Sequence, residues 1–130
     1  MKTVCMCGSF RHYEEMLALR DALLASGASC EWPTTELRRD PKTMTEEEAK
    51  TAILSHLERM DRADLILIYN TDGYFGNSVV MEIGYAYARR KPLYALMPIQ
   101  DPFLMGLVTA VVSPEDFIEV ARAGPGALRE

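Results

Sequence analysis

The chain has 130 residues, enough for a single domain spanning residues 1–130 and too few for separate catalytic and regulatory domains. Hydrophobic residues make up 48% and charged residues 25%, as in an ordinary soluble globular protein. With 14 Lys and Arg against 19 Asp and Glu, the net charge is −5, which disfavours a nucleic-acid polymer as partner but allows a small anionic ligand at a local positive site.

The N-terminus and the cysteines bear on compartment and metal binding. No apolar run approaches the roughly 20 residues that span a bilayer, and no signal-peptide pattern is present, so we expect a cytoplasmic protein without membrane contact. Cys5 and Cys7 fall on one face of a buried strand, and together with Cys30 they lack the spacing of a zinc site. We therefore expect core packing for these two cysteines, no metal and no cofactor.

Strand and helix patterns alternate through the first half of the sequence. A strand is predicted at residues 3–7, an amphipathic helix at residues 10–26 and a second strand at residues 28–32, followed by a polar stretch at residues 33–44. Gly27 ends the helix. Thr45 and Glu48 form a capping box, which opens a helix whose core-facing residues are Ala49, Ile53, Leu57 and Met60.

The second half continues the alternation. Residues 63–70, ADLILIYN, form the clearest buried strand because their apolar run is nearly continuous. The remaining predicted elements are a helix at residues 77–90, strands at residues 92–97 and 107–112, and a helix at residues 114–123 capped by Ser113.

Five strands that alternate with helices predict an α/β fold, specifically a flavodoxin-like three-layer sandwich with a five-stranded parallel sheet in the order 2-1-3-4-5. In this order the second and third strands lie on opposite sides of the first, so the switch point of the sheet lies between the first and third strands. The loops after Cys7 and Asn70 should therefore line the ligand crevice.

The loop after the first strand contains the candidate binding residues Gly8, Ser9, Phe10 and Arg11. Gly8 permits close backbone approach, and Ser9 could hold a phosphate, a sugar hydroxyl or a base edge, or could simply cap the helix. The loop lacks the Gly-Lys-Ser/Thr of a Walker motif and the glycines of a dinucleotide fingerprint. Triphosphate and NAD binding of those kinds are therefore not expected.

The loop after the third strand supplies a second group of candidate binding residues, namely Asn70, Asp72, Gly76, Asn77 and Ser78. Asn70 and Asp72 lie at the carboxyl end of the strand, and Asn77 is a good N-cap for the next helix. Tyr74 and Phe75 could stack on a planar ring or cover the sheet edge.

Glu82 is the only charged residue in residues 77–88, NSVVMEIGYAYA. A buried carboxylate is costly unless it is paired or its chemistry is needed, so Glu82 is the leading catalytic candidate. A glutamate that only offsets the helix dipole is disfavoured by its apolar neighbours. His56 is interpreted as a solvated or core-satisfied histidine and His12 as part of an exposed polar helix face, and neither is assigned a catalytic role.

Three segments carry a family resemblance: CGSF at residues 7–10, ADLILIYN, and GYFGNSVVMEIGYAYARRKPLYAL at residues 73–96. Together they resemble the nucleoside 2-deoxyribosyltransferase-like family, which includes the transferases and related nucleotide N-glycoside hydrolases. The resemblance implies that Glu82 is the nucleophile and that Asp72 helps to hold the nucleobase. It also implies that residues 8–11 contact the ligand.

The preferred interpretation is an enzyme that cleaves the N-glycosidic bond of a (deoxy)nucleoside or its 5′-monophosphate by double displacement through Glu82, with transfer to another base or to water. Asp72, Asn70 or a water would supply the proton or hydrogen bond to the departing base. A 5′-phosphate could be held by Ser9, Arg11 and Ser78. The alternative is a non-catalytic nucleotide-binding or sensing module on the same fold.

Residues 97–107 form an apolar segment that is too hydrophobic for a free loop. We expect this segment to contact a second subunit, so the sequence predicts a homodimer or a higher homo-oligomer.

Overall fold

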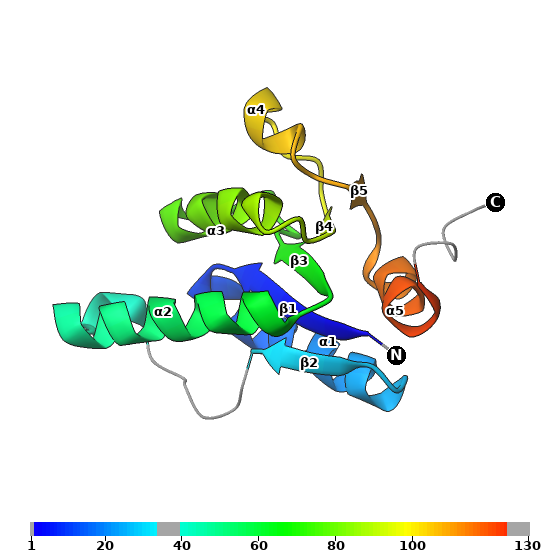
Figure 1. Ribbon diagram of the computed structural model, residues 1–130, viewed down its shortest axis with the longest axis horizontal. Helices are drawn as coiled ribbons and strands as arrows, with labels where there is room; N and C mark the ends of the chain where they lie inside the picture. The colour runs from blue at the N-terminus through cyan, green and yellow to red at the C-terminus, as the bar shows by residue number, and fades with distance from the viewer. Residues whose placement is uncertain (1, 34–39, 125–130) are drawn as a thin grey trace.

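The computed structural model describes residues 2–33 and 40–124, so part of the predicted polar stretch, residues 34–39, lies outside the described residues. Its five strands form one parallel sheet in the order β2-β1-β3-β4-β5, which confirms the predicted flavodoxin-like topology (Figure 1). The strands are β1 (Thr3–Gly8), β2 (Ser29–Trp32), β3 (Leu65–Tyr69), β4 (Leu93–Ala95) and β5 (Ala110–Val111).

Side chains alternate between the two faces of this sheet. Val4 and Met6 of β1 enter one core cluster, whereas Cys5 and Cys7 enter the other. The prediction that the two cysteines share a buried face is therefore confirmed. Every residue of β3 is buried, as a central parallel strand requires.

Helices cover both faces of the sheet (Figure 1). One face packs against α1 (Tyr13–Ala25) and α5 (Pro114–Ala123), and the other against α2 (Glu46–Arg62), α3 (Asn77–Ala88) and the short α4 (Pro102–Met105). The 3₁₀ helices η1 (Phe10–His12) and η2 (Pro41–Thr43) precede α1 and α2. The β1 and β3 carboxyl ends thus lie beneath the amino end of α3, where this topology places ligands.

Helix caps explain where several elements begin and end. The Thr45 hydroxyl accepts a hydrogen bond from the Glu48 N–H at 3.1 Å, and the Glu48 carboxylate accepts one from the Thr45 N–H at 3.0 Å, so the predicted capping box is confirmed. Ser113 caps α5 as predicted. Gly27 follows α1 with a φ of 100°, a backbone conformation that glycine adopts without strain.

Three predicted boundaries are wrong for local reasons. The N-cap of α3 is Gly76 and not Asn77, because the Gly76 carbonyl accepts the first helical hydrogen bonds from Val79 and Val80. The first helix begins as η1, in which the His12 N–H bonds to the Ser9 carbonyl. β5 has two residues and not six, because residues 104–108 form a hydrogen-bonded turn after α4.

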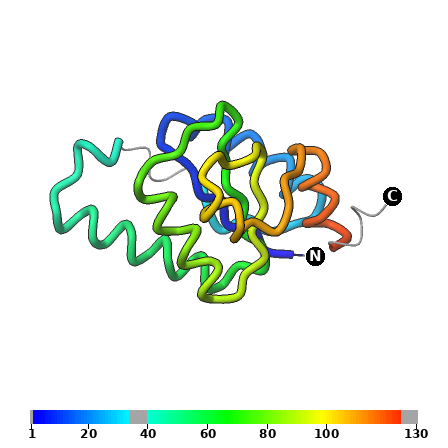
Figure 2. Tube along the Cα trace, turned by 90° about the horizontal axis from the view of Figure 1, so that it is seen from above, coloured from blue at the N-terminus to red at the C-terminus, as the bar shows by residue number. Residues whose placement is uncertain are grey.

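The amino-terminal half of α2 extends beyond the edge of the sheet (Figures 1 and 2). The buried residues of α2 are His56 and Met60, both in its second half. Ala49, predicted to face the core, is exposed, because the helix outruns the strand beneath it. The overhanging half of α2, residues 46–55, therefore forms a wall beside the carboxyl ends of the strands.

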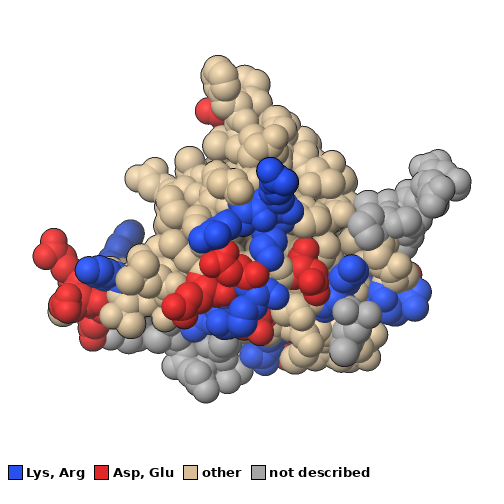
Figure 3. Space-filling model, in the orientation of Figure 1, with Lys and Arg blue, Asp and Glu red and all other residues tan. Residues whose placement is uncertain are grey.

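Surface charge is mixed in sign. Figure 3 shows Lys and Arg interspersed with Asp and Glu on the lower part of the visible face. Ion pairs of the protein include Arg62 with Glu31 and Arg89 with Asp61. The protrusion that carries α4 is nearly free of charge on this face (Figure 3). Within residues 2–33 and 40–124, no helix combines the length and the apolar character needed to cross a bilayer.

Candidate active site

Cys7, His56 and Glu82 meet beneath α2 and α3. Cys7 lies near the carboxyl end of β1, His56 in the second half of α2 and Glu82 in the second turn of α3. The Cys7 Sγ lies 3.5 Å from the His56 Nε2, which lies 3.7 Å from the Glu82 Oε2. All three side chains are buried. Ionisable groups buried together cost free energy, which marks this cluster as a candidate functional site.

The packing of α3 puts Glu82 on the buried side of the helix. Val79, Ile83 and Ala86 define that side at spacings of four and three, and Glu82 lies three residues after Val79 and four before Ala86. Only 6% of Glu82 is exposed. The helix sequence therefore carries the carboxylate into the interior, as its apolar composition indicated.

Burial changes the acidity of Glu82 and of its thiol neighbour. It raises the pKa of Glu82 to about 7, although the hydrogen bond from the Cys7 thiol acts in the opposite direction. Hydrogen bonding with Cys5, burial and the nearby Glu82 charge raise the pKa of Cys7 well above its ordinary range. At neutral pH the thiol is therefore protonated and can donate to the carboxylate.

His56 lies on the other side of the carboxylate. Burial, with the nearby Arg59 charge as a smaller cause, lowers the pKa of His56 to about 4. The imidazole is therefore neutral at physiological pH. In this form one ring nitrogen donates and the other accepts a hydrogen bond.

Glu82 and His56 line a cavity of about 840 Å³. Its walls come from the β1–α1 loop, α1, the overhanging half of α2 and the first turns of α3, and most of the lining is apolar. This volume falls within the range of small-molecule sites, roughly 300–1,000 Å³. The cavity lies at the carboxyl edge of the strands, as the fold topology predicts for a ligand site.

One wall of the cavity is aromatic. The rings of Phe10 and Tyr13 stack at 5.8 Å, Tyr13 contacts Trp32 edge-on at 6.4 Å, and Trp32 contacts His56 at 5.7 Å. The Arg59 guanidinium lies 4.8 Å from the Trp32 ring centre. Such a wall offers stacking surfaces for a planar ring and one adjacent positive charge.

Four of the predicted site residues line this one cavity, namely Gly8, Phe10, Ser78 and Glu82. Gly8 is required there by packing, because a Cβ atom at this position would lie 2.9 Å from the Met16 Sδ and 3.1 Å from the Tyr69 Cβ. Gly76, the N-cap of α3, and Asn77, its first residue, are not among the lining residues.

Ser9 and Arg11 make contacts away from the cavity. The Ser9 hydroxyl accepts a hydrogen bond from the Arg11 N–H at 3.4 Å, so Ser9 caps η1. The Arg11 guanidinium lies 3.4 Å from the Asp72 carboxylate and 4.2 Å from the centre of the Tyr74 ring. These contacts join the first loop to the second and leave neither residue in the cavity lining.

The Asn70 side chain bonds to the backbone that follows β4. Its side chain is fully buried, its oxygen accepts hydrogen bonds from the Leu96 and Met97 N–H groups, and its amide donates to the Met97 carbonyl. The residue anchors the chain after β4. Both ends of the amide bond to backbone, so Asn70 has an anchoring role, and its part in ligand binding stays a prediction.

Asp72 also lies apart from Glu82. Its carboxylate accepts a hydrogen bond from the Tyr74 N–H at 3.0 Å and lies 3.0 Å from the His12 Nε2. Asp72 lines a separate cavity of about 540 Å³ with residues 73–75 and 97–101. The Tyr74 N–H, assisted by His12 and Arg11, lowers the pKa of Asp72, which keeps it ionised and unsuited to proton donation at neutral pH.

The fold and the sequence together identify the family. The family model for nucleoside 2-deoxyribosyltransferase matches residues 6–121, which include the end of β1, the other four strands and the Glu82 cluster. The chain belongs to this family. No curated protein matches the sequence.

Solved structures related to this nucleoside 2-deoxyribosyltransferase family member share its fold. A conserved protein from Enterococcus faecalis V583 superposes with a TM-score of 0.68 at 18% identity, over 92% of this chain and 96% of the other. The 2-deoxyribosyltransferase of Bacillus psychrosaccharolyticus gives 0.62 at 16% identity, over 89% and 90%. The Clostridium botulinum CMP N-glycosidase BcmB gives 0.54 at 13% identity, over 91% and 96%.

Sequence reasoning missed several residues in this family member's site. His56 was excluded, yet it lies beside Glu82, and its spacing of four from the buried Met60 was the available signal. His12 was expected on an exposed face, but η1 turns it inward against Tyr69 and Asp72. Trp32 and Arg59 gave no sequence signal, because their contact joins β2 to α2.

Proposed function

We propose that this protein cleaves the N-glycosidic bond of a nucleoside or its 5′-monophosphate, with Glu82 as the nucleophile. The observation that carries the proposal is a buried carboxylate with a pKa raised to about 7 in the wall of a cavity large enough for a nucleotide. Family membership and the fold shared with a 2-deoxyribosyltransferase and a CMP N-glycosidase support the same chemistry.

The reaction would proceed as a double displacement. The ionised Glu82 attacks the anomeric carbon, the C–N bond breaks, and its electron pair leaves with the base. The Cys7 thiol and the neutral imidazole beside the carboxylate hold it in place. Attack on the anomeric carbon by a second base or by water then releases Glu82. Asn70 and Asp72 are engaged elsewhere, so water supplies the proton for the departing base.

The cavity walls suggest how a substrate would be held. The aromatic surfaces of Phe10, Tyr13 and Trp32 would bind the base by stacking. Arg59 and the amino end of α3 near Ser78 would attract a 5′-phosphate, because both present positive charge to the same cavity. This pair replaces Ser9 and Arg11 as the proposed anion site.

A second copy of this chain would cover apolar side chains that are exposed in the single chain. Phe103 in α4 is 86% exposed and Met97 is 42% exposed, both within the segment predicted to make subunit contacts. Met81, which lines the cavity, is 42% exposed, and Leu54 on α2 is 51% exposed. We infer a homo-oligomer in which these apolar side chains are covered.

The test of function is direct. The protein is incubated with a panel of nucleosides and 5′-monophosphates, with and without a free acceptor base, and products are separated by chromatography. We expect base release or exchange, reduced more than about 1,000-fold in Glu82→Gln. Glu58→Gln, on the exposed side of α2, is the matched control and should retain activity. Ligand binding without turnover would instead favour the non-catalytic binding module.

A further inference from the structure

The atoms that surround the proposed nucleophile are also a set of metal ligands. The Cys7 sulfur, a His56 ring nitrogen and a Glu82 carboxylate oxygen all lie within 4.8 Å of one another. Thiolate, imidazole and carboxylate are the three side-chain groups that bind zinc in proteins. All three are buried and come from different elements, so the folded chain alone brings them together.

Two of the three ligand-to-ligand distances are close to those around a tetrahedral ion, and the Cys7 sulfur lies within 4.8 Å of the carboxylate oxygen. Zinc held at roughly 2.3 Å by sulfur and roughly 2.0–2.1 Å by nitrogen puts those two ligand atoms about 3.5 Å apart. The Cys7 Sγ and the His56 Nε2 are separated by 3.5 Å, and the His56 Nε2 and the Glu82 Oε2 by 3.7 Å. A shift of a few tenths of an ångström by the Glu82 carboxylate would bring its oxygen to the distance from the His56 nitrogen that a tetrahedral zinc ion requires.

Charge favours the same ion. A thiolate and a carboxylate neutralise a divalent cation, so the occupied site would carry no net charge in the interior. Cys7 would lose its proton on binding, since the metal lowers the pKa of a coordinated thiol strongly enough to overcome burial. His56 and Glu82 both line the cavity, which leaves the fourth coordination position open to water or to a small anion.

We propose that Cys7, His56 and Glu82 form a zinc site in which the metal ties up the Glu82 carboxylate. A carboxylate oxygen bound to zinc cannot attack an anomeric carbon. If Glu82 acts as proposed above, zinc would therefore be a reversible inhibitor of bond cleavage, bound within the site itself and competing for the nucleophile.

Cobalt(II) is the probe, because its tetrahedral thiolate complexes have a thiolate-to-metal charge-transfer band and intense visible bands. We expect both bands on titration of the purified protein, saturation at one ion per chain, and loss of both when zinc is added. His56→Gln, Cys7→Ser and Glu82→Gln should each weaken cobalt binding more than about 100-fold, because each removes a direct ligand. Circular dichroism confirms that each variant is folded.

Cys30→Ser is the matched control. Cys30 packs against the core cluster on the opposite face of the sheet, so this variant should bind cobalt like the parent protein. His56→Gln changes only α2 and keeps the test decisive if Cys7→Ser fails to fold. The proposed zinc site would be contradicted if no charge-transfer band appears, or if the parent protein and His56→Gln bind cobalt equally well.

Activity is measured separately, so that the two proposals can fail independently. Cobalt binding without any base release would reject the proposed function and leave the metal site standing. Base release that is unaffected by saturating zinc would overturn the inhibition, whereas zinc inhibition reversed by a chelator would support it.

Discussion

The His56 Nε2 lies 3.7 Å from a Glu82 carboxylate oxygen, a distance typical of an ion pair, yet burial favours the neutral form of both groups. With the pKa of His56 lowered to about 4 and that of Glu82 raised to about 7, neither group is charged between these values. Above pH 7, Glu82 becomes an anion beside a neutral imidazole. The pair is therefore a polar contact and not a salt bridge.

Activity should depend on pH through Glu82. Because the nucleophile must be ionised, we expect kcat/KM to rise with pH up to about 7 and then to level off. Steady-state kinetics across this range checks the expectation, and Glu58→Gln should show the same profile. An acidic limb centred near 4.5, the ordinary glutamate value, would show that a buried carboxylate is not the group being titrated.

Stability should depend on pH through the same carboxylate. The pKa of Glu82 is 4.5 in the unfolded chain and about 7 in the fold, so the native state loses stability as pH rises between these values. Glu82→Gln removes this loss. We expect the free energy of unfolding of the variant to equal that of the parent near pH 4.5 and to exceed it by about 3 kcal/mol above pH 7. Urea denaturation at several pH values measures the difference, and a pH-independent difference would contradict the prediction.

Arg59 should distinguish a nucleotide from a nucleoside. Arg59→Met keeps the aliphatic stem and removes the charge in the cavity wall, so KM for a 5′-monophosphate should rise about 10- to 100-fold, as for a lost charged hydrogen bond. KM for the nucleoside should change little. Arg62→Met, which removes an exposed guanidinium paired with Glu31, is the control. Equal effects on both substrates would exclude phosphate recognition by Arg59.

Asp72 should tolerate an amide. Its oxygen caps the Tyr74 N–H, and Asn can make the same bond, so Asp72→Asn should retain most activity while Asp72→Ala loosens the loop and lowers thermal stability. Kinetics and thermal melts of the two variants make the comparison. An equal loss of about 100-fold in both variants would instead indicate acid–base chemistry by Asp72.

The assembly state should depend on α4. Light scattering is expected to give a dimer or a larger species, and Phe103→Ser should shift it toward the monomer because an 86% exposed aromatic ring is removed. Leu24→Ser is the matched control, since Leu24 is 48% exposed on α1. A monomeric parent protein with full activity would reject the subunit contact.

The fold was predictable because its signals are local. The continuous apolar run of β3, the capping box at Thr45 and the glycine after α1 each act within a few residues, and all three were found where they were expected. The two-residue β5 was not, because its length is set by the turn that follows α4.

The site was predictable only in part. Glu82 could be singled out because a lone charge in an apolar helix is visible in the sequence itself. The anchoring role of Asn70 could not be predicted, because its partners, the backbone groups of Leu96 and Met97, lie more than twenty residues away. His56 was missed for a similar reason, since only the packing of α2 against β1 brings it to the carboxylate.

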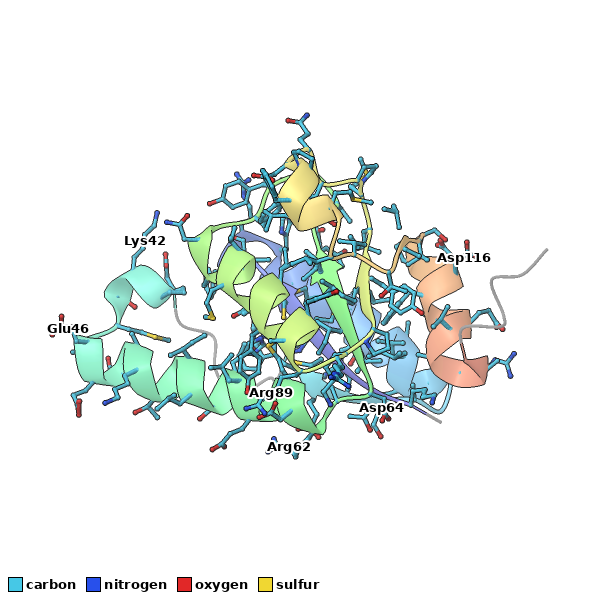
Figure 4. All side chains as sticks on the ribbon, turned by 45° about the horizontal axis from the view of Figure 1, so that its top comes forward. Lys42, Glu46, Arg62, Asp64, Arg89 and Asp116 are labelled. Carbon is cyan, nitrogen blue, oxygen red and sulfur yellow. The ribbon has the colours of Figure 1, made fainter. Side chains whose placement is uncertain are left out.

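The two halves of α2 have different surroundings, and we expect only the overhanging half to affect which substrate is bound. The buried residues of this helix, His56 and Met60, lie in the half that packs on the sheet, whereas the projecting residues 46–55 wall the cavity. Figure 4 shows Glu46 at the free end of α2, with Lys42 on the preceding η2, and Arg62 at the opposite end of the helix. Because substitutions there remove little buried surface, the wall can change with small cost to folding. Substitutions in the overhanging half of α2 could therefore change the substrate that is bound during evolution, while Glu82 stays the same.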